Sequence, residues 1–266
     1  MGFVCRGDPE SVKMVDDLIK RFRSRADIVV EPETARKLGF PETKIEEMDV
    51  EFIVSVGGDG TILRTIRKME DPKPILGINM GTLGFLVDVE PKDAVRTLER
   101  VLFGFEVMER SRLQTLLNGK PLPPATNEIA LLSASPAKML EFEITVDDSL
   151  LESLRADGLL FATSTGSTAY AMSAGGPIVD PRVDAIVLVP MAPFKLSARP
   201  WVLPAESVIK VDLDLPEKEA LVVIDGQNVA TISKRDHITI SRAEKPARFV
   251  KAREGGFYEK VKSKLA

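Results

Sequence analysis

Residues 52–66, with the sequence FIVSVGGDGTILRTI, decide how this chain is expected to fold. An apolar run suited to a buried strand leads into three glycines, and a helical pattern leads out, which predicts a strand, a tight turn and a helix. Such glycines let a ligand approach the backbone, and a helix that begins after them offers free N–H groups to an anion. Asp59 inside this turn fits a group that orients or deprotonates a hydroxyl, or helps hold a metal, beside a phosphoryl group. An ordinary strand-to-helix turn is the alternative, but it needs fewer glycines and no acid.

The composition narrows the classes of partner. Apolar residues make up 44% and charged residues 29% of 266 residues, and the net charge is −4. This balance is typical of a globular protein and gives no reason to expect nucleic acid or a membrane as a partner. Cys5 is the single cysteine, which excludes an intramolecular disulfide and a cysteine metal cluster. No signal peptide or bilayer-length apolar run is present, so the predicted location is cytoplasmic.

Strands and helices alternate from residue 1 to about residue 104. This alternation predicts an α/β domain with a Rossmann-like, mainly parallel sheet that helices cover on both faces. A second glycine-rich turn, residues 79–84, follows the strand after the one that ends at Val56. Both turns should therefore lie at the carboxyl edge of the sheet, where open α/β folds bind ligands.

The pattern changes to short alternating runs over residues 105–250. These runs, separated by turn signals such as Asp225-Gly226, predict an all-β second domain that is sandwich-like or barrel-like. A hydroxyl-rich segment, residues 164–176, interrupts the strands and predicts a turn followed by a short helix. Residues 251–266 should form a helical tail, with Phe257, Val261 and Leu265 on one face, that packs back on the first domain.

Polar groups of the second domain suggest an acceptor site, although each has a plainer interpretation. Asn127 and Glu128 side by side can grip a ribose diol, because a carboxylate accepts two O–H bonds; alone, they would be an exposed strand end. The hydroxyls and amides of residues 165–173 could bind an adenine edge or a phosphate, or could form a helix cap. His237 is the single histidine and is expected to be structural, which argues against histidine catalysis and histidine metal sites.

Taken together, these segments resemble the NAD kinase family. The resemblance rests on blocks in family order along nearly the whole chain: Gly57-Gly58-Asp59-Gly60-Thr61, Leu83-Gly84-Phe85-Leu86, Asn127-Glu128, Asp157-Gly158, Thr165-Gly166-Ser167-Thr168-Ala169-Tyr170, Gly175-Gly176-Pro177 and Leu196-Ser197-Ala198-Arg199-Pro200. The first block is shared with diacylglycerol-type and sphingoid lipid kinases, whereas the Asn127-Glu128 pair and the block from Thr165 are more specific. The family commonly has Cys and His where this chain has Ala192 and Phe194.

The resemblance implies transfer of a phosphoryl group from ATP or polyphosphate to the 2′-hydroxyl of the adenosine ribose of NAD, which makes NADP. Asp59 would be the catalytic residue that activates this hydroxyl, and Mg²⁺ would accompany the donor without a dedicated protein metal site. The chain would be a homodimer or homotetramer. The implied substrate-binding residues are Gly58, Gly60, Thr61, Arg64, Phe85, Asn127, Glu128, Lys138, Arg155, Asp157, Thr165, Thr168, Ala169, Tyr170, Ala171, Met172, Ser173, Ala192 and Gln227.

Two other functions are weighed against this one. A lipid kinase would share the glycine–aspartate turn, but the chain lacks an obvious membrane-directed patch. A dinucleotide sensor without catalysis would have little use for Asp59 in a phosphate turn. If the chain is an NAD kinase, residues 127–128 and 165–170 should face Asp59 across a cleft in the folded protein or its oligomer.

Overall fold

The structure is a computed structural model that describes residues 1–81, 84–135, 138–214, 219–252 and 256–265. The chain divides into two units, Met1–Glu109 with Ala247–Ala266, and Arg110–Pro246. The division therefore falls at residues 109 and 246, where the sequence suggested 104 and 250. Of the family blocks, Leu83 lies outside the described residues.

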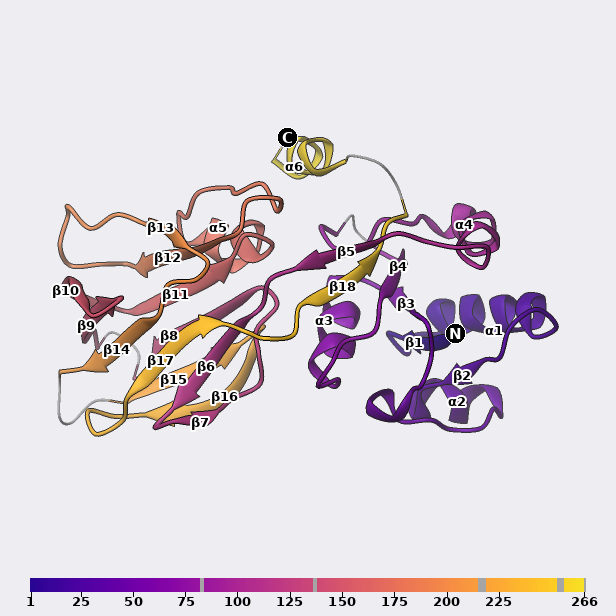
Figure 1. Cartoon of the computed structure of the whole chain (residues 1–266), viewed down its shortest axis with the longest axis horizontal. Coiled ribbons are helices and arrows are strands. Elements are labelled where there is room, and N and C mark those ends of the chain that lie inside the picture. Colours follow the sequence, from indigo (N-terminus) through magenta and orange to yellow (C-terminus); the bar gives the residue numbers. More distant parts are fainter. Residues whose placement is uncertain (82–83, 136–137, 215–218, 253–255, 266) are drawn as a thin grey trace. The chain divides into compact units, whose positions relative to one another are not determined.

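The first unit has the expected alternation of strands and helices (Figure 1). Its strands are β1 (Gly2–Cys5), β2 (Val29–Val30), β3 (Ile53–Gly57), β4 (Ile75–Asn79), β5 (Val107–Arg110) and β18 (Ala247–Val250). Its helices are α1 (Pro9–Phe22), α2 (Pro32–Leu38), α3 (Asp59–Arg67), α4 (Ala94–Val101) and α6 (Phe257–Leu265), with short 3₁₀ turns η1 (Ile45–Glu47) and η2 (Pro91–Asp93).

The sheet of this unit runs in the order β2-β1-β3-β4-β18-β5, and β2, β1, β3, β4 and β18 pair in parallel. Local signals fix the helices around it. Asp8 caps α1 by accepting a 3.1 Å hydrogen bond from the backbone N–H of Ser11, and Pro9 fills the first helical position. Gly39, at φ 65°, ends α2 in the left-handed conformation that glycine tolerates best.

Alternate side chains of the strands build a core on each face of the sheet. On one face, Phe3, Val54 and Leu76 pack in a cluster with α1 and α4. On the other, Val4 and Ile53 pack with α3. Helices thus cover both faces, as the sequence predicts, and β1, β3 and β4 end together at one carboxyl edge.

The second unit consists mainly of strands (Figure 1). They are β6 (Leu113–Leu117), β7 (Lys120–Pro121), β8 (Glu128–Ser133), β9 (Leu140–Val146), β10 (Ser149–Ala156), β11 (Gly158–Thr163), β12 (Ala185–Met191), β13 (Trp201–Pro204), β14 (Ile209–Leu213), β15 (Ala220–Ile224), β16 (Gln227–Ile232) and β17 (Ile238–Arg242). The hydroxyl-rich segment forms the 3₁₀ turn η3 (Gly166–Thr168) and the one-turn helix α5 (Tyr170–Ser173), as predicted.

These strands form two antiparallel sheets, ordered β10-β9-β14-β17-β6-β7 and β13-β12-β11-β8-β15-β16. Inward-facing residues of both sheets, among them Phe142 and Phe161, share one apolar core. The predicted sandwich-like fold is therefore confirmed. Among the described residues, no helix is long and apolar enough to cross a bilayer.

The C-terminal helix α6 contacts the first unit, which confirms that the tail packs back on the first domain. The ammonium group of Lys260 donates hydrogen bonds to the carbonyl oxygens of Phe85 at 2.9 Å and Val87 at 3.2 Å. The sequence pattern suggested only an apolar stripe for this helix, whereas these contacts are polar. Strands β5 and β18, which fall within the range expected for the second domain, belong to the sheet of the first unit.

Candidate functional site

The glycine turn after β3 has the predicted form. Gly57 ends the strand and α3 begins at Asp59. A Cβ atom on Gly57 would lie 2.4 Å from the hydroxyl oxygen of Thr61, so only glycine fits there. Apart from the flanking residues and the backbone of α3, no described atom lies within 4 Å of a Cβ added to Gly58 or Gly60, which leaves this side of both open to a ligand.

The carboxylate of Asp59 is held by three consecutive backbone amides. Its Oδ2 accepts a hydrogen bond from the N–H of Phe85 at 2.7 Å, and its Oδ1 accepts from Leu86 at 3.0 Å and Val87 at 3.2 Å. A Cβ on Gly84 would lie 2.0 Å from Oδ1, so this approach requires glycine at that position too. The two glycine-rich turns are thereby joined at the carboxyl edge through Asp59.

Helix α6 also contacts the segment whose amides bind Asp59. Lys260 hydrogen-bonds two carbonyl oxygens of this segment and pairs with the carboxylate of Asp88. The ammonium group of Lys264 lies 4.4 Å from the centroid of the Phe85 ring, in a cation–π contact. Phe85, which the resemblance places at the substrate, therefore contacts α6 in this structure.

Arg64 makes its described contacts within the fold. Its Nη2 donates to the carbonyl oxygen of Cys5 at 2.7 Å and to Glu31 Oε1 at 3.0 Å. Glu31 is only 2% exposed, so the guanidinium compensates a buried carboxylate while it ties α3 to β1. A substrate contact of Arg64 stays a prediction.

Sequence reasoning missed Arg6, which follows β1 at the same carboxyl edge. Its Nη2 lies 3.4 Å from the carbonyl oxygen of Met80, and its Nε donates to Asp8 at 2.8 Å. The hydrogen bonds from Arg6 and Ser11 hold the pKa of Asp8 well below its usual range. A cation directly after the first strand was the signal that could have identified it.

The Asn127-Glu128 pair of the second unit is held in the same way as the Asp59 segment. Asp225 Oδ1 accepts from the backbone N–H of Asn127 at 2.8 Å and of Glu128 at 3.1 Å, and its Oδ2 accepts from Thr126 at 2.8 Å. Asp225 has φ 45°, and burial raises the pKa of its carboxyl group. The sequence identified this residue only as part of a turn.

The hydroxyl-rich segment lies against the same pair. Thr163 donates its hydroxyl to the carbonyl oxygen of Thr126 at 2.7 Å and its backbone N–H to that of Asn127 at 2.9 Å. A Cβ on Gly166 would lie 2.0 Å from the carbonyl oxygen of Asn127, so the turn η3 touches that residue directly. The structure thus brings together two segments that the sequence assigned to one site.

Glu128 is a buried acid at the centre of this group. Its Oε2 has no hydrogen-bond partner among the described atoms. Burial, followed by the nearby charge of Asp225, raises the pKa of Glu128 to about 7, while a backbone hydrogen bond from Tyr170 opposes the shift. A buried carboxylate with a vacant acceptor suits a ligand that brings a hydroxyl donor.

The other predicted residues of the second unit lie at the opposite end of β8 and β11. The backbone N–H of Phe194 donates to the carbonyl oxygen of Arg155 at 2.8 Å, and the Arg155 guanidinium lies 5.5 Å from the Phe194 ring centroid. The backbone carbonyl oxygen of Asp157 accepts from the N–H of Ser133, whose hydroxyl donates to the carbonyl oxygen of Lys138. Ala192, at φ 43°, lies two residues before Phe194.

The predicted binding residues of this unit therefore form two groups. Glu128 pairs with Ala162 near one end of the strands, and Leu132 pairs with Gly158 near the other. A β-strand extends about 3.3 Å per residue, so the distance between the two groups exceeds the size of one ribose. Gln227, with Thr165, Thr168, Ala169, Ala171, Met172 and Ser173, belongs to the end that carries Glu128.

The described residues form no protein cage for a metal. Over the described part of the chain, no three side chains of His, Cys, Asp and Glu gather where they could hold an ion. Three amides already occupy acceptor positions of Asp59. Mg²⁺ is usually bound by one or two carboxylates, by waters and by substrate phosphates, so this donor set fits an ion that arrives with a phosphate donor.

Comparison with known proteins shows the family of this chain. The family model of the ATP-NAD kinase N-terminal domain matches residues 8–104, and that of the ATP-NAD kinase C-terminal domain matches residues 126–252. The NAD kinase of Methanosarcina mazei is 55% identical over 270 residues, which cover 100% of this chain and 93% of that protein. The NAD kinase of Thermococcus kodakarensis is 45% identical over 260 residues, which cover 94% and 93%.

Solved structures give the same result. The crystal structure of an NAD kinase from Archaeoglobus fulgidus in complex with ATP is 35% identical, with a TM-score of 0.82 and 98% of each chain covered. The crystal structure of yeast NADH kinase complexed with NADH has a TM-score of 0.91 and covers 99% of this chain and 86% of that one. Its sequence is 24% identical, so this likeness shows the fold alone. Since both family models match and relatives named as NAD kinases span the whole chain, this protein belongs to the NAD kinase family.

Proposed function

We propose that the NAD kinase activity of this chain depends on Asp59, which accepts a hydrogen bond from the 2′-hydroxyl of the adenosine ribose of NAD. The observation that carries the proposal is the clamp of three backbone amides on this carboxylate, beside an open glycine turn. A side chain held so firmly is oriented before the substrate binds. Phosphoryl transfer gains most from such positioning.

The free acceptor position on Asp59 lies on Oδ2. Two carboxylate oxygens offer about four acceptor positions, of which three are used: two on Oδ1 and one on Oδ2. The ribose hydroxyl donates to the remaining position. Its oxygen then attacks the terminal phosphorus, the bond from that phosphorus to the leaving phosphate oxygen breaks, and the proton passes to Asp59 or to water.

The donor phosphates are assigned to the first unit. The backbone of Gly58 and Gly60 is open to a ligand, and the N-terminus of α3 attracts an anion. Arg6 at the same edge supplies a positive charge. Mg²⁺ bound to these phosphates would offset their charge, which Asp59 would otherwise repel.

The acceptor is assigned to the second unit. Asn127 and Glu128, fixed by Asp225, grip the ribose, and Thr165 to Tyr170 contact the adenine. Glu128 contributes a buried oxygen that lacks a partner in the described structure. The expectation that these segments face Asp59 across a cleft stays a prediction.

The separation of the two groups of binding residues favours a homo-oligomer. Arg155 and Asp157 lie at the far end of β11 from Thr163. One bound dinucleotide would therefore have to extend along the whole strand to contact both groups. We assign the group around Arg155 to the site of a neighbouring subunit, in a homodimer or homotetramer. The choice between ATP and polyphosphate as donor, and the cytoplasmic location, stay predictions.

The purified protein tests the proposal when it is incubated with NAD, Mg²⁺ and either ATP or polyphosphate. The expected product is NADP. It is identified by its reduction by an NADP-specific dehydrogenase and by the ³¹P signal of a 2′-phosphate. Diacylglycerol is assayed in parallel as acceptor. Phosphorylated lipid without NADP, or dinucleotide binding without NADP from any donor, would overturn the proposal.

A further inference from the structure

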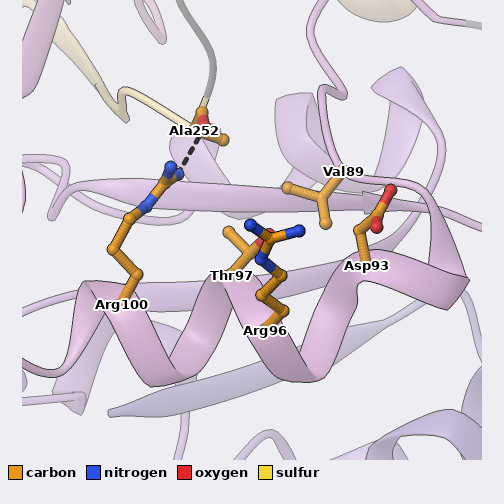
Figure 2. A pocket seen from close by; sticks show the side chains of 6 residues that line it. All are labelled: Val89, Asp93, Arg96, Thr97, Arg100 and Ala252. Atoms are coloured by element: carbon orange, nitrogen blue, oxygen red, sulfur yellow. Dashed lines mark hydrogen bonds between the residues drawn. The ribbon is translucent and has the colours of Figure 1, made fainter.

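A polar cavity of about 290 Å³ lies beside α4 in the first unit, and none of the predicted site residues lines it. Its lining consists of Val89, Asp93, Arg96, Thr97, Arg100 and Ala252. Figure 2 shows Arg96 and Arg100 rising from the same side of α4, with Asp93 at the end nearest Val89. Residues four apart on a helix are neighbours, so the two guanidinium groups are placed to act on one ligand.

The two arginines differ in how they are engaged. Arg100 Nη2 donates a hydrogen bond to the carbonyl oxygen of Ala252, which fixes this side chain at one wall (Figure 2). Arg96 makes no hydrogen bond or ion pair with any residue that the structure describes. A second cavity, of about 470 Å³, adjoins at Arg100 and Ala252 and adds Lys251. In that second cavity Lys251 pairs with Glu106, so the cations that favour an anion are the two arginines of the first.

The chemistry of this lining favours an anion with several oxygens. Guanidinium groups bind phosphate and carboxylate through paired N–H donors, and the hydroxyl of Thr97 adds a further donor. A water molecule takes up about 30 Å³, so the cavity accommodates a hydrated phosphate or diphosphate group. The described lining of this cavity contains one carboxylate, that of Asp93, and two arginines, so its side chains carry a net positive charge.

The cavity is connected through the backbone to the catalytic carboxylate. Val89 pairs with Ile78 of β4, and its carbonyl oxygen accepts from the N–H of Asn79 at 2.8 Å. Two residues earlier, the N–H of Val87 donates to Asp59. A ligand that packs on Val89 would therefore act on the segment that holds Asp59.

We propose that this cavity binds an anion of the phosphate class through Arg96 and Arg100, and that its occupancy steadies the segment from Phe85 to Val89. The site is separate from the phosphoryl site at the glycine turn. Free phosphate and a diphosphate group share the required chemistry, and separate titrations with inorganic phosphate and pyrophosphate show which of the two binds more tightly.

The test is a titration of the full chain with inorganic phosphate, and separately with pyrophosphate, at constant ionic strength. Amide chemical shifts of Thr97 and Val89 report the new site, and those of Gly58 and Gly60 report the glycine turn. Arg96→Gln should weaken binding at Thr97 by about tenfold or more, the loss expected for one charge-assisted hydrogen bond, and should leave binding at Gly60 unchanged. Arg235→Gln, which removes an exposed cation from a turn of the second unit, is the matched control and should change neither.

Because Arg96 has no described partner, its replacement should leave the fold intact. Equal affinity at Thr97 in wild type and Arg96→Gln, or no saturable shift there, would overturn the proposed site. Acetate at the same ionic strength should bind more weakly, and equal binding would overturn the phosphate class. Phosphate should slow amide hydrogen exchange of residues 85–87 in wild type but not in Arg96→Gln; unchanged exchange in wild type would overturn the proposed link to Asp59.

Discussion

The carboxylate of Asp59 and the backbone N–H of Phe85, 26 residues apart in sequence, are joined by a hydrogen bond of 2.7 Å. This bond and its two neighbours convert a short loop into the support of the proposed catalytic group. Asp225 supports Asn127 in the same manner, across 98 residues. In each unit, a buried or half-buried carboxylate thus fixes a backbone segment by three successive N–H groups.

Gly84→Ala should disturb this support without replacing any reacting group. The added Cβ would lie 2.0 Å from Asp59 Oδ1 and 2.6 Å from the Val87 side chain, so the segment must shift. We expect kcat to fall about 100-fold, the loss typical of a catalytic group displaced by about 1 Å. Steady-state kinetics measure this, and Gly81→Ala is the control, because its Cβ meets only the end of Arg6 at 3.4 Å. Equal kcat in both variants would contradict the account.

Asp225→Asn should mainly weaken NAD binding. An amide has one oxygen, so its NH₂ group would face a backbone N–H of residues 126–128 and leave it unpaired, at a cost of about 1–3 kcal/mol. We expect KM for NAD to rise about tenfold or more while kcat changes less, since the ribose grip is loosened and Asp59 is untouched. The control is Asp148→Asn, another turn residue with positive φ, which is exposed. A fall in kcat with KM unchanged would argue against a positioning role.

The raised pKa of Glu128 predicts that the free energy of unfolding depends on pH. Burial raises its pKa from 4.5 to about 7, so the folded protein keeps a proton that the unfolded chain loses between these values. The contribution of Glu128 is therefore fully present below pH 4.5, falls as pH rises, and is gone above about pH 7. The total change is about 3 kcal/mol from a shift of this size.

Chemical denaturation at several pH values measures this effect. Glu128→Gln, which stays neutral, should remove that part of the decline in unfolding free energy between pH 4.5 and 7. Glu141→Gln on β9 serves as a control at a carboxylate of the same unit. Identical pH profiles of wild type and Glu128→Gln would show that Glu128 titrates normally.

Lys260→Gln should loosen the Asp59 segment from the side of α6. The ammonium group holds two carbonyl oxygens and Asp88, and a glutamine cannot replace three donors. We expect faster amide hydrogen exchange at residues 85–87 and a kcat several-fold lower. Lys262→Gln, an exposed lysine of the same helix, should change neither. If exchange at residues 85–87 were the same in both variants, the clamp by α6 would not operate in solution.

The sequence was sufficient for those features that depend on local pattern. The turn around Asp59, the cap at Asp8, and the change from helices to short strands all follow from neighbouring residues. The grouping of Asn127 with the segment after Thr163 came from the family resemblance. In the structure Thr163, which precedes that segment, donates hydrogen bonds to the carbonyl oxygens of Thr126 and Asn127, and Gly166 lies directly against Asn127.

What the sequence could not provide are contacts between distant residues. Asp225 looked like an ordinary hairpin turn, because its partners are backbone groups almost 100 residues away. Lys260 was one charge among several on an amphipathic tail. Strand β18 follows a run of β-strands and gives no local signal that it joins the first sheet. Arg64 looked like a free cation because nothing near it in sequence indicates the buried Glu31.

The central claim is that Asp59 activates the acceptor hydroxyl, and Asp59→Asn tests it most directly. NADP formation from NAD, ATP and Mg²⁺ is measured beside NAD binding by calorimetry, with Asp49→Asn, a fully exposed carboxylate, as the control. The account predicts that Asp59→Asn still binds NAD but loses about 100-fold to 10,000-fold in kcat, the range for general acid–base groups. An Asp59→Asn enzyme that turns over at close to the wild-type rate would contradict the account.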